Sequence, residues 1–329
     1  MQYTKLNGID LPVSRLAFGC MSTVASQTYP GLAEQQAVDT IRAAFDAGIN
    51  FFDTARAYGD GESEELLGKA LADVRDKVVI ASKPKAGDLS ESEVLSECEH
   101  SLKSLGTDFI DLYQIHWPKR VVPLEETVRA MEKLVQQGKV RTIGVCNFGP
   151  LDLEEWLGIG PVITNQFAYS LIARGPEFGT QQACVEHDIG ILCYSPIAQG
   201  LLAGAYEAAD DVPSGKARTR HFRGDRPEAR HGEPGCESAT FAALRSVRDI
   251  AESIDRPMAD VAIAWLLSRP GVTAALVGAS TAKSVQRNIA AADLQLSQET
   301  IDRLDAATEE VKQKMGPSID MWASPPRTR

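Results

Sequence analysis

The chain has 329 residues, of which 43% are hydrophobic and 24% charged, a balance typical of a globular protein with one large domain or two modest ones. Its formal net charge of −11 argues against a general surface for nucleic acid or for anionic membranes. There is no run near the ~18 apolar residues of a membrane span and no secretory signal, and the six scattered cysteines lack a C-x-x-C pair, so a cytoplasmic enzyme or binding domain is expected.

Short apolar runs alternate with helical segments along the chain. The helical segments carry an apolar stripe and ordinary boundary signals, as in 35–47, which stops at Gly48, or in the segment opened by Ser90 and Glu93. The short runs are nearly continuous in apolar residues, which is typical of parallel strands buried on both faces. They are residues 16–18, 49–52, 78–81, 110–115, 141–145, 162–165, 191–194 and 274–277.

The spacing of these runs favours a barrel. From the second run to the fifth, strand starts recur about every 30 residues, the length of one strand–helix unit. Eight such units predict a closed (β/α)8 TIM barrel, so residues 1–329 are expected to form a single domain. An open doubly wound sheet is the main alternative, but it usually binds a nucleotide through a glycine fingerprint. Neither G-x-G-x-x-G nor G-x-x-x-x-G-K-[ST] occurs here.

Two segments lack this regularity. Residues 206–234 follow the seventh predicted strand, contain many charged residues, Gly and Pro, and include the locally basic stretch 216–230. Such a segment is either a solvated surface loop or a binding loop, and barrels commonly build phosphate sites after their last two strands. The tail 315–329 has no periodicity and is expected to be irregular, either wrapping the surface or hanging free.

Polar residues follow three consecutive predicted strands. Asp53 closes the second strand and Tyr58 lies in the loop after it, while Lys83 follows the third and His116 the fourth. Each alone has an ordinary structural explanation, as a cap, a packing residue or a surface charge. Because barrel active sites form at the C-terminal ends of the strands, all four are expected to converge on one rim.

Together these four side chains suit the reduction of a carbonyl group. Hydride arriving at a carbonyl carbon leaves charge on the oxygen, which needs a proton donor and fixed polar groups. Tyr58 would donate the proton, with its pKa lowered by the Lys83 ammonium. Asp53 would hold Lys83 charged and in place, and His116 would donate a hydrogen bond to the same oxygen.

The chain resembles the aldo-keto reductases, first in the segment GINFFDTARAYGDGESEELLGKAL and then in IASKP and DLYQIHWP. The resemblance continues in order through GKVRTIGVCNF, NQFAYSLIAR, CYSPIAQGLLAG and residues 275–281, and it covers nearly the whole chain. The resemblance is to the bacterial NADPH-dependent members of this family. These members belong to a branch that also resembles the potassium-channel β-subunits. It implies a (β/α)8 barrel that reduces aldehydes and ketones with NAD(P)H, without a metal. In this family Tyr58 would be the general acid, tuned by Lys83 and Asp53, and His116 would orient the carbonyl.

The same resemblance implies a set of cofactor residues. Asn147 and Gln166 match positions that hold the nicotinamide carboxamide, and Tyr194 matches the ring stacked on the nicotinamide. The residues that match the pyrophosphate loop are Ser195, Pro196, Ala198, Gly200 and Leu201. The residues that match the adenosine end are Gly278, Ser280, Thr281, Ser284 and Asn288. The long loop 206–234 is expected to lie over this cofactor.

The resemblance favours NADPH as the cofactor without deciding between NADPH and NADH. Some members have Lys or Arg at the position of Ser280, where it grips the 2′-phosphate, but others share the GAST pattern and still use NADP. Many of these have Gln where this chain has Ser284. Lys283, Arg287 or a basic residue of 216–230 would compensate, since a group that fixes a phosphate should be cationic. Cys146 replaces a common Ser, which weakens one amide contact.

The expected partner is a small carbonyl substrate, with Trp117 and Arg56 as candidate walls of its pocket. No metal site is expected, because His221 and His231 lack the spacing of metal ligands. Two other functions remain open: an NAD-dependent alcohol or sugar dehydrogenase, and a cofactor-sensing regulatory protein on the same fold. The sequence predicts neither the physiological substrate nor the oligomeric state.

Overall fold

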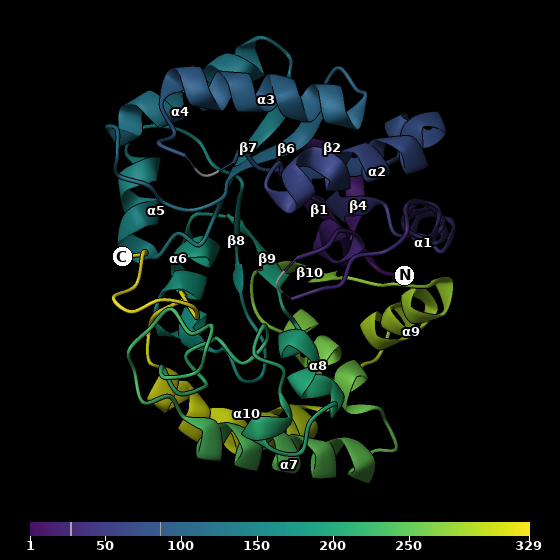
Figure 1. Ribbon diagram of the computed structural model, residues 1–329, viewed down its shortest axis with the longest axis vertical. Coiled ribbons are helices and arrows are strands. Elements are labelled where there is room, and N and C mark those ends of the chain that lie inside the picture. The colour runs from purple at the N-terminus through teal and green to yellow at the C-terminus, as the bar shows by residue number, and fades with distance from the viewer. Residues whose placement is uncertain (27, 86) are drawn as a thin grey trace.

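The computed structural model describes residues 1–26, 28–85 and 87–329. Within them, eight parallel strands form a closed barrel in the order β10-β3-β4-β5-β6-β7-β8-β9, surrounded by helices (Figure 1). The strands are β3 (Leu16–Gly19), β4 (Phe51–Asp53), β5 (Val79–Ser82), β6 (Ile110–Ile115), β7 (Val140–Cys146), β8 (Thr164–Ala168), β9 (Gly190–Tyr194) and β10 (Val272–Val277). Each overlaps one predicted strand, so the predicted (β/α)8 barrel is confirmed.

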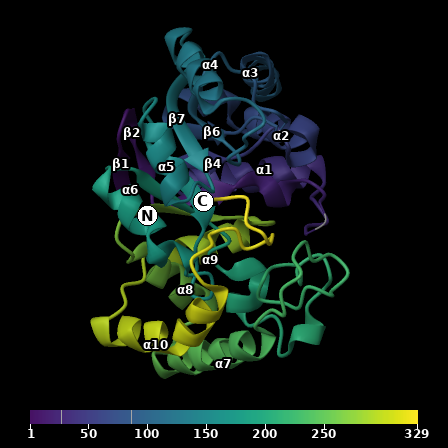
Figure 2. The ribbon, with the colours of Figure 1, turned by 90° about the vertical axis from the view of Figure 1, so that its left-hand side faces the viewer.

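The helices follow the strands and cover the outside of the barrel. They are α1 (Glu34–Asp46), α2 (Glu62–Leu71), α3 (Glu91–Leu105), α4 (Leu124–Gln136), α5 (Pro150–Leu157), α6 (Thr180–Glu186), α7 (Glu237–Ser253), α8 (Met258–Leu267), α9 (Ala282–Ala292) and α10 (Gln298–Met315). In both ribbon views α7 and α10 lie side by side (Figures 1 and 2). Among the described residues, no helix has both the length and the apolar character needed to cross a bilayer.

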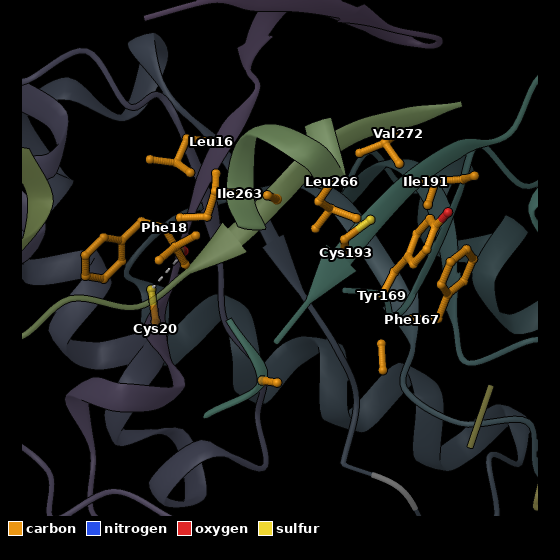
Figure 3. Close-up of a cluster of buried hydrophobic side chains, with 14 of the residues drawn as sticks. Leu16, Phe18, Cys20, Phe167, Tyr169, Ile191, Cys193, Ile263, Leu266 and Val272 are labelled. Carbon is orange, nitrogen blue, oxygen red and sulfur yellow. Dashed lines mark hydrogen bonds between the residues drawn. The ribbon is translucent and has the colours of Figure 1, made fainter. Parts of the chain in front are cut away.

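Alternate residues along each strand face the barrel interior, because successive side chains of a strand point to opposite faces. The inner layer contains Ala17, Phe51, Val79, Ala81, Leu112, Leu192, Ala274 and Leu276. The residues between them pack outward against the helices. Figure 3 shows part of this outer layer, where Leu16, Cys193 and Val272 lie beside Ile263 and Leu266 of α8.

An N-terminal hairpin closes the bottom of the barrel. Its strands β1 (Tyr3–Leu6) and β2 (Ile9–Ser14) pair antiparallel, and Leu6, Ile9 and Val13 join the inner layer. A Cβ on Gly190, at the start of β9, would lie 2.8 Å from the Leu6 side chain, so the hairpin sits tightly against the strand starts. The hairpin was not among the predicted elements, although Asn7-Gly8 between apolar residues is a hairpin signal.

The long segment 206–234 contains the short 3-10 turn Ala209–Asp211 but no α-helix or β-strand among these residues. It is anchored rather than fully solvated, because Phe222 and His221 are buried. His221 Nε2 lies 2.7 Å from the carbonyl oxygen of Ile172, which can only accept, so Nε2 carries the proton. In the neutral ring Nδ1 then accepts from the Thr219 hydroxyl at 3.0 Å.

The C-terminal tail after α10 is irregular and runs back along the molecule to α5 (Figure 2). It contacts the long loop through a bond from the Arg220 amide to the Met321 carbonyl, 2.8 Å, and a bridge between Arg230 and Ala323. Its end is fixed by the buried Asp152, whose Oδ2 accepts from the Arg329 amide at 2.8 Å. The tail therefore wraps the surface, which was one of the two arrangements left open by the sequence.

Replacing Gly144 by Ala should destabilise the barrel. A Cβ there would lie 2.3 Å from Thr164 Oγ1, inside the barrel, and such overpacking typically costs about 1–3 kcal/mol. Adding Thr164→Ala should recover part of the loss because it removes the crowding oxygen. Urea unfolding measures both effects. The control is Gly158→Ala, because a Cβ there would lie 3.5 Å from the nearest neighbouring atom, the Glu155 carbonyl oxygen, which is an ordinary contact distance. Equal stability of the Gly144→Ala and control proteins would contradict the inward placement of Gly144.

The stability of the protein should fall as the pH drops from 6.5 to 4. Burial lowers the pKa of His221 from the ordinary 6.5 to about 4, so in this window the unfolded chain binds more protons than the folded one. One such proton changes the unfolding free energy by up to about 1.4 kcal/mol per pH unit. His221→Gln should reduce this slope by the share of one histidine, and His100→Gln, at an exposed site, should leave it unchanged. Identical pH dependence of unfolding in both variants would refute this assignment.

Candidate active site

A cleft of about 660 Å³ opens where the barrel strands end. It is lined by residues at or just after the C-terminal ends of the strands, including Gly19, Asp53, His116, Asn147, Tyr194 and Gly278. The long loop contributes Lys216, Arg218 and Arg230 to its walls, and the tail contributes Trp322 and Arg327.

A buried ion pair lies at the base of this cleft. Lys83 is fully buried, and its Nζ donates to Asp53 Oδ1 at 2.7 Å and to the Thr54 carbonyl at 2.8 Å. The other carboxylate oxygen, Asp53 Oδ2, accepts from the side-chain amides of Gln166 at 2.8 Å and Gln114 at 3.2 Å. Burial is the largest single influence on Lys83 and lowers its pKa, but the charge and hydrogen bond of Asp53, together with smaller contributions of Tyr58 and Cys146, outweigh burial and raise the lysine pKa above its usual range. Lys83 is therefore charged at neutral pH.

Inward alternation explains why these groups meet. Asp53 is two residues beyond the inner-layer Phe51, and Lys83 is two residues beyond Ala81. Gln114 is likewise two residues beyond the inner-layer Leu112. The strand pattern that fills the barrel with apolar side chains thus ends in polar ones at the cleft. Gln114 was not a predicted site residue, but its position two residues before His116 was a usable signal.

Tyr58 and His116 lie beside this ion pair. Their ring centres are 6.0 Å apart in an edge-on arrangement, and Lys83 Nζ lies 5.3 Å from the centre of the Tyr58 ring. Burial raises the pKa of Tyr58 to about 12 and outweighs the opposing effect of Lys83. The expectation of a lowered tyrosine pKa is therefore wrong for this structure. It considered the Lys83 ammonium, which lowers the pKa, and did not consider the burial of the phenol, which raises it more. Burial, with the charges of Lys83 and Arg327, lowers the pKa of His116 to about 3, so its ring is neutral.

The residues matched to the nicotinamide lie next to these groups. Asn147 has φ 62° and its Nδ2 donates to the His116 carbonyl at 3.1 Å. Tyr194 donates its hydroxyl proton to Asn147 Oδ1 at 2.8 Å and its side chain lines the cleft. Gln166 also lines the cleft, and its Oε1 accepts no hydrogen bond from any described residue. This oxygen is therefore available to an amide N–H of a bound ligand.

The turn after β9 has a left-handed backbone at several positions. The φ angles are 55° at Ser195, 46° at Ala198, 56° at Gln199 and 102° at Gly200. Non-glycine residues pay of order 1–3 kcal/mol each for such conformations, which cluster at ligand-binding sites. Of the five residues matched to the pyrophosphate, three line the cleft, namely Ser195, Pro196 and Gly200, whereas Ala198 and Leu201 are buried and are not among its lining residues.

Two buried oxygens in the cleft lack partners. The side-chain oxygens Gln199 Oε1 and Ser22 Oγ are buried, and neither has a hydrogen-bond partner among the residues that the structure describes. Both residues line the cleft. Since buried polar atoms are normally hydrogen-bonded, these two fit a polar ligand bound in this place.

The residues matched to the adenosine end surround the start of α9. Gly278, Ser280 and Ser284 line the cleft, and so does Arg287, which makes no hydrogen bond or ion pair with a described residue. Thr281 caps the helix, accepting from the Ser284 amide at 3.2 Å. Asn288 is buried and donates to the Gly278 carbonyl at 3.3 Å. Thr281 and Asn288 therefore shape the loop, and Ser280, Ser284 and Arg287 face the cleft.

The two predicted substrate residues differ in their positions. Trp117 lines the cleft, and the guanidinium carbon of Arg327 lies 3.5 Å from the centre of its ring. Arg56 does not line the cleft, because its Nη1 turns to Asp60 Oδ1 at 3.1 Å. Its prediction as a substrate wall is not supported by this position. Arg327 was not predicted, since nothing in the aperiodic tail indicated that it would return to the strand ends.

Comparisons with known proteins identify the family of this chain. A sequence model of the Aldo/keto reductase family matches residues 15–309. An aldo-keto reductase of Bacillus subtilis is 33% identical over 294 residues, which cover 85% of each chain. The structure of a glycerol dehydrogenase from Gluconobacter oxydans, 29% identical, matches with a TM-score of 0.81 over 94% of this chain and 95% of its own.

A second solved structure comes from Klebsiella pneumoniae and is an aldo/keto reductase in complex with NADP and acetate. It is 29% identical, with a TM-score of 0.76, and the match covers 97% of this chain and 99% of the other. The family match over nearly the whole chain confirms the resemblance seen in the sequence. The chain therefore belongs to the aldo/keto reductase family of oxidoreductases.

Proposed function

We propose that the protein reduces aldehydes or ketones to alcohols with NADPH and that Tyr58 is the general acid. The observation that carries this proposal is the buried Asp53–Lys83 pair beside Tyr58 and His116 at the base of the cleft. At this point Tyr58 supplies a proton donor, Lys83 a fixed positive charge and His116 a neutral imidazole. This is the set of groups that a carbonyl oxygen needs as it gains negative charge.

The nicotinamide supplies a hydride to the carbonyl carbon when it is bound. Tyr58 donates its hydroxyl proton to the carbonyl oxygen, and its pKa of about 12 keeps that proton in place at neutral pH. Lys83 then stabilises the phenolate, because its ammonium lies near the ring and stays charged. The neutral ring of His116 donates a hydrogen bond to the same oxygen and orients the carbonyl.

The residues of the cleft fit a dinucleotide. Gln166 and Asn147 would hold the carboxamide and Tyr194 would stack on the nicotinamide, while the left-handed turn after β9 would receive the pyrophosphate. The start of α9 is suited to an anion, because a helix N-terminus offers free amides and a partial positive charge. Arg287 lines the cleft at this point and favours the 2′-phosphate of NADPH over the hydroxyl of NADH.

The first experiment is a titration with NADPH and with NADH, followed by tryptophan fluorescence, beside 340 nm assays with aldehydes and ketones. Tighter binding of NADPH together with carbonyl-dependent oxidation of the cofactor is the expected result. Tight binding without turnover on any carbonyl would instead favour the cofactor-sensing role. Preference for NADH with alcohol oxidation would favour the dehydrogenase, and no binding of either nucleotide would contradict all three.

Tyr58→Phe should lower kcat by about 10²–10⁴-fold, because it removes only the proton donor. The Kd for NADPH should stay within about twofold of wild type, as measured by fluorescence titration. The control is Tyr3→Phe, at an exposed tyrosine whose hydroxyl bonds the Gly48 carbonyl far from the cleft. Turnover at the wild-type rate in Tyr58→Phe would refute the role of Tyr58.

Arg287→Gln should weaken NADPH binding roughly tenfold or more and leave the Kd for NADH nearly unchanged. The reason is the loss of one charge-assisted contact to the 2′-phosphate, which NADH lacks. Lys283→Gln is the matched control, because Lys283 is on the same helix but does not line the cleft. An equal loss for both nucleotides would place Arg287 elsewhere on the cofactor.

A further inference from the structure

The wall of the cleft formed by the C-terminal tail carries an arginine held in one orientation. Asp320 is fully buried and accepts from Arg327 Nε at 2.7 Å and from Arg327 Nη2 at 2.8 Å. The same carboxylate accepts from the backbone amide of Trp322 at 3.1 Å, so it also sets the course of the tail. The guanidinium of Arg327 is thus fixed along one edge before any ligand binds.

The rest of this guanidinium is open to the cleft. Its flat face covers the ring of Trp117, with Cζ 3.5 Å from the ring centre. Nη1 makes no hydrogen bond with any residue that the structure describes, and the side chain is 41% exposed. Arg327 lines the same cleft as Tyr58 and His116, and its charge acts on the His116 ring. An arginine with two free N–H donors therefore lies next to the part of the cleft that contains Tyr58 and His116.

Further positive charge gathers along this wall. Arg230 lines the cleft and forms a backbone bridge with Ala323 of the tail, and the Arg218 guanidinium lies 5.0 Å from the ring centre of Trp322. Among the described lining residues the only carboxylate is Asp53, which Lys83 neutralises. Asp320 offsets the charge of Arg327 from behind the wall, so the excess of positive charge in this part of the lining comes from Arg218 and Arg230.

The position of Arg327 argues that this charge serves the substrate and not the adenosine phosphate. Arg327 stacks on Trp117, which follows β6, whereas Arg287 and Ser280 follow β10. In the strand order of the closed barrel, β6 and β10 are four strands apart and hence opposite each other. Arg327 and Arg287 therefore lie on opposite sides of the cleft.

We infer that the substrate is a small aldehyde or ketone that also carries a carboxylate, and that Arg327 binds this carboxylate while the carbonyl lies at Tyr58 and His116. Arg327 offers the Nη1 donors, Arg230 adds long-range attraction, and Trp117 and Trp322 contact the apolar part between the two groups. Because Asp320 already fixes the guanidinium, little side-chain entropy is lost on binding. This inference rests on the proposed function and goes beyond it in naming the substrate class.

The test compares two aldehydes that differ in one charge, 4-carboxybenzaldehyde and methyl 4-formylbenzoate. The wild-type kcat/KM should be roughly tenfold or more higher for the acid, and Arg327→Gln should bring the ratio of the two values to within about twofold of one. Arg327→Lys should keep part of the preference because it keeps the charge. The Kd for NADPH should change by less than about twofold, which separates a substrate contact from a cofactor contact.

A second variant controls for the possibility that Arg327→Gln disturbs the structure of the tail. Asp320→Asn/Arg327→Gln removes both charges and leaves no buried carboxylate unpaired, and it should show the same loss of preference. Arg248→Gln, which breaks an ion pair with Glu207 outside the cleft, should leave the ratio unchanged. Arg230→Gln should lower the ratio by a smaller factor, because it removes attraction and not a direct contact.

The outcomes separate this inference from the proposed function. Reduction of the ester as efficiently as the acid by the wild type would overturn the inference and leave carbonyl reduction intact. An equal loss for both aldehydes in Arg327→Gln, or a large rise in the Kd for NADPH, would assign Arg327 to structure or to the cofactor. If the wild type reduced neither of the two aldehydes and no neutral carbonyl compound, both proposals would be overturned.

Discussion

The structure of the site depends on keeping one lysine charged inside a protein barrel. Burying an ammonium costs several kcal/mol unless it is paired and hydrogen-bonded. Lys83 meets both conditions through Asp53 and the Thr54 carbonyl, and Asp53 is held in turn by Gln114 and Gln166. The groups around this carboxylate lie within or just after four different strands, β4, β5, β6 and β8. A register slip of one residue in any of these strands would turn its polar group away from the barrel interior.

Strand alternation accounts for much of what the sequence could predict. The apolar runs indicated the strands, and the polar residues directly after them indicated the rim, so Asp53, Lys83 and His116 could be placed before the structure was known. Local signals suffice for these positions, because each side chain belongs to the strand that carries it. Asn147 and Tyr194 were indicated by the family resemblance and not by these local signals. Both line the cleft, and their roles on a bound cofactor are proposals.

Other features depend on contacts between distant segments, and the sequence could not supply them. The pKa of Tyr58 is the sum of burial and charge, and only the charge was visible from neighbouring motifs. Arg327 reaches Trp117 across 210 positions of the chain, through a tail without periodicity whose course is set by the buried Asp320. Arg56 lies in the signature segment, yet Asp60 draws its side chain away from the cleft. In each case the deciding partner is not marked by any local pattern.

Closure of the barrel also links the two ends of the chain. Strand β3 pairs with β10, with Leu16 opposite Ala275, so the seam joins segments about 260 positions apart. Gly19 and Gly278, at the top of this seam, are both lining residues of the cleft. A molecule bound there touches both sides of a contact that costs much chain entropy to form and is therefore slow to assemble. By mass action, a molecule bound in the cleft should stabilise the pairing of β3 with β10 and slow the opening of the native barrel.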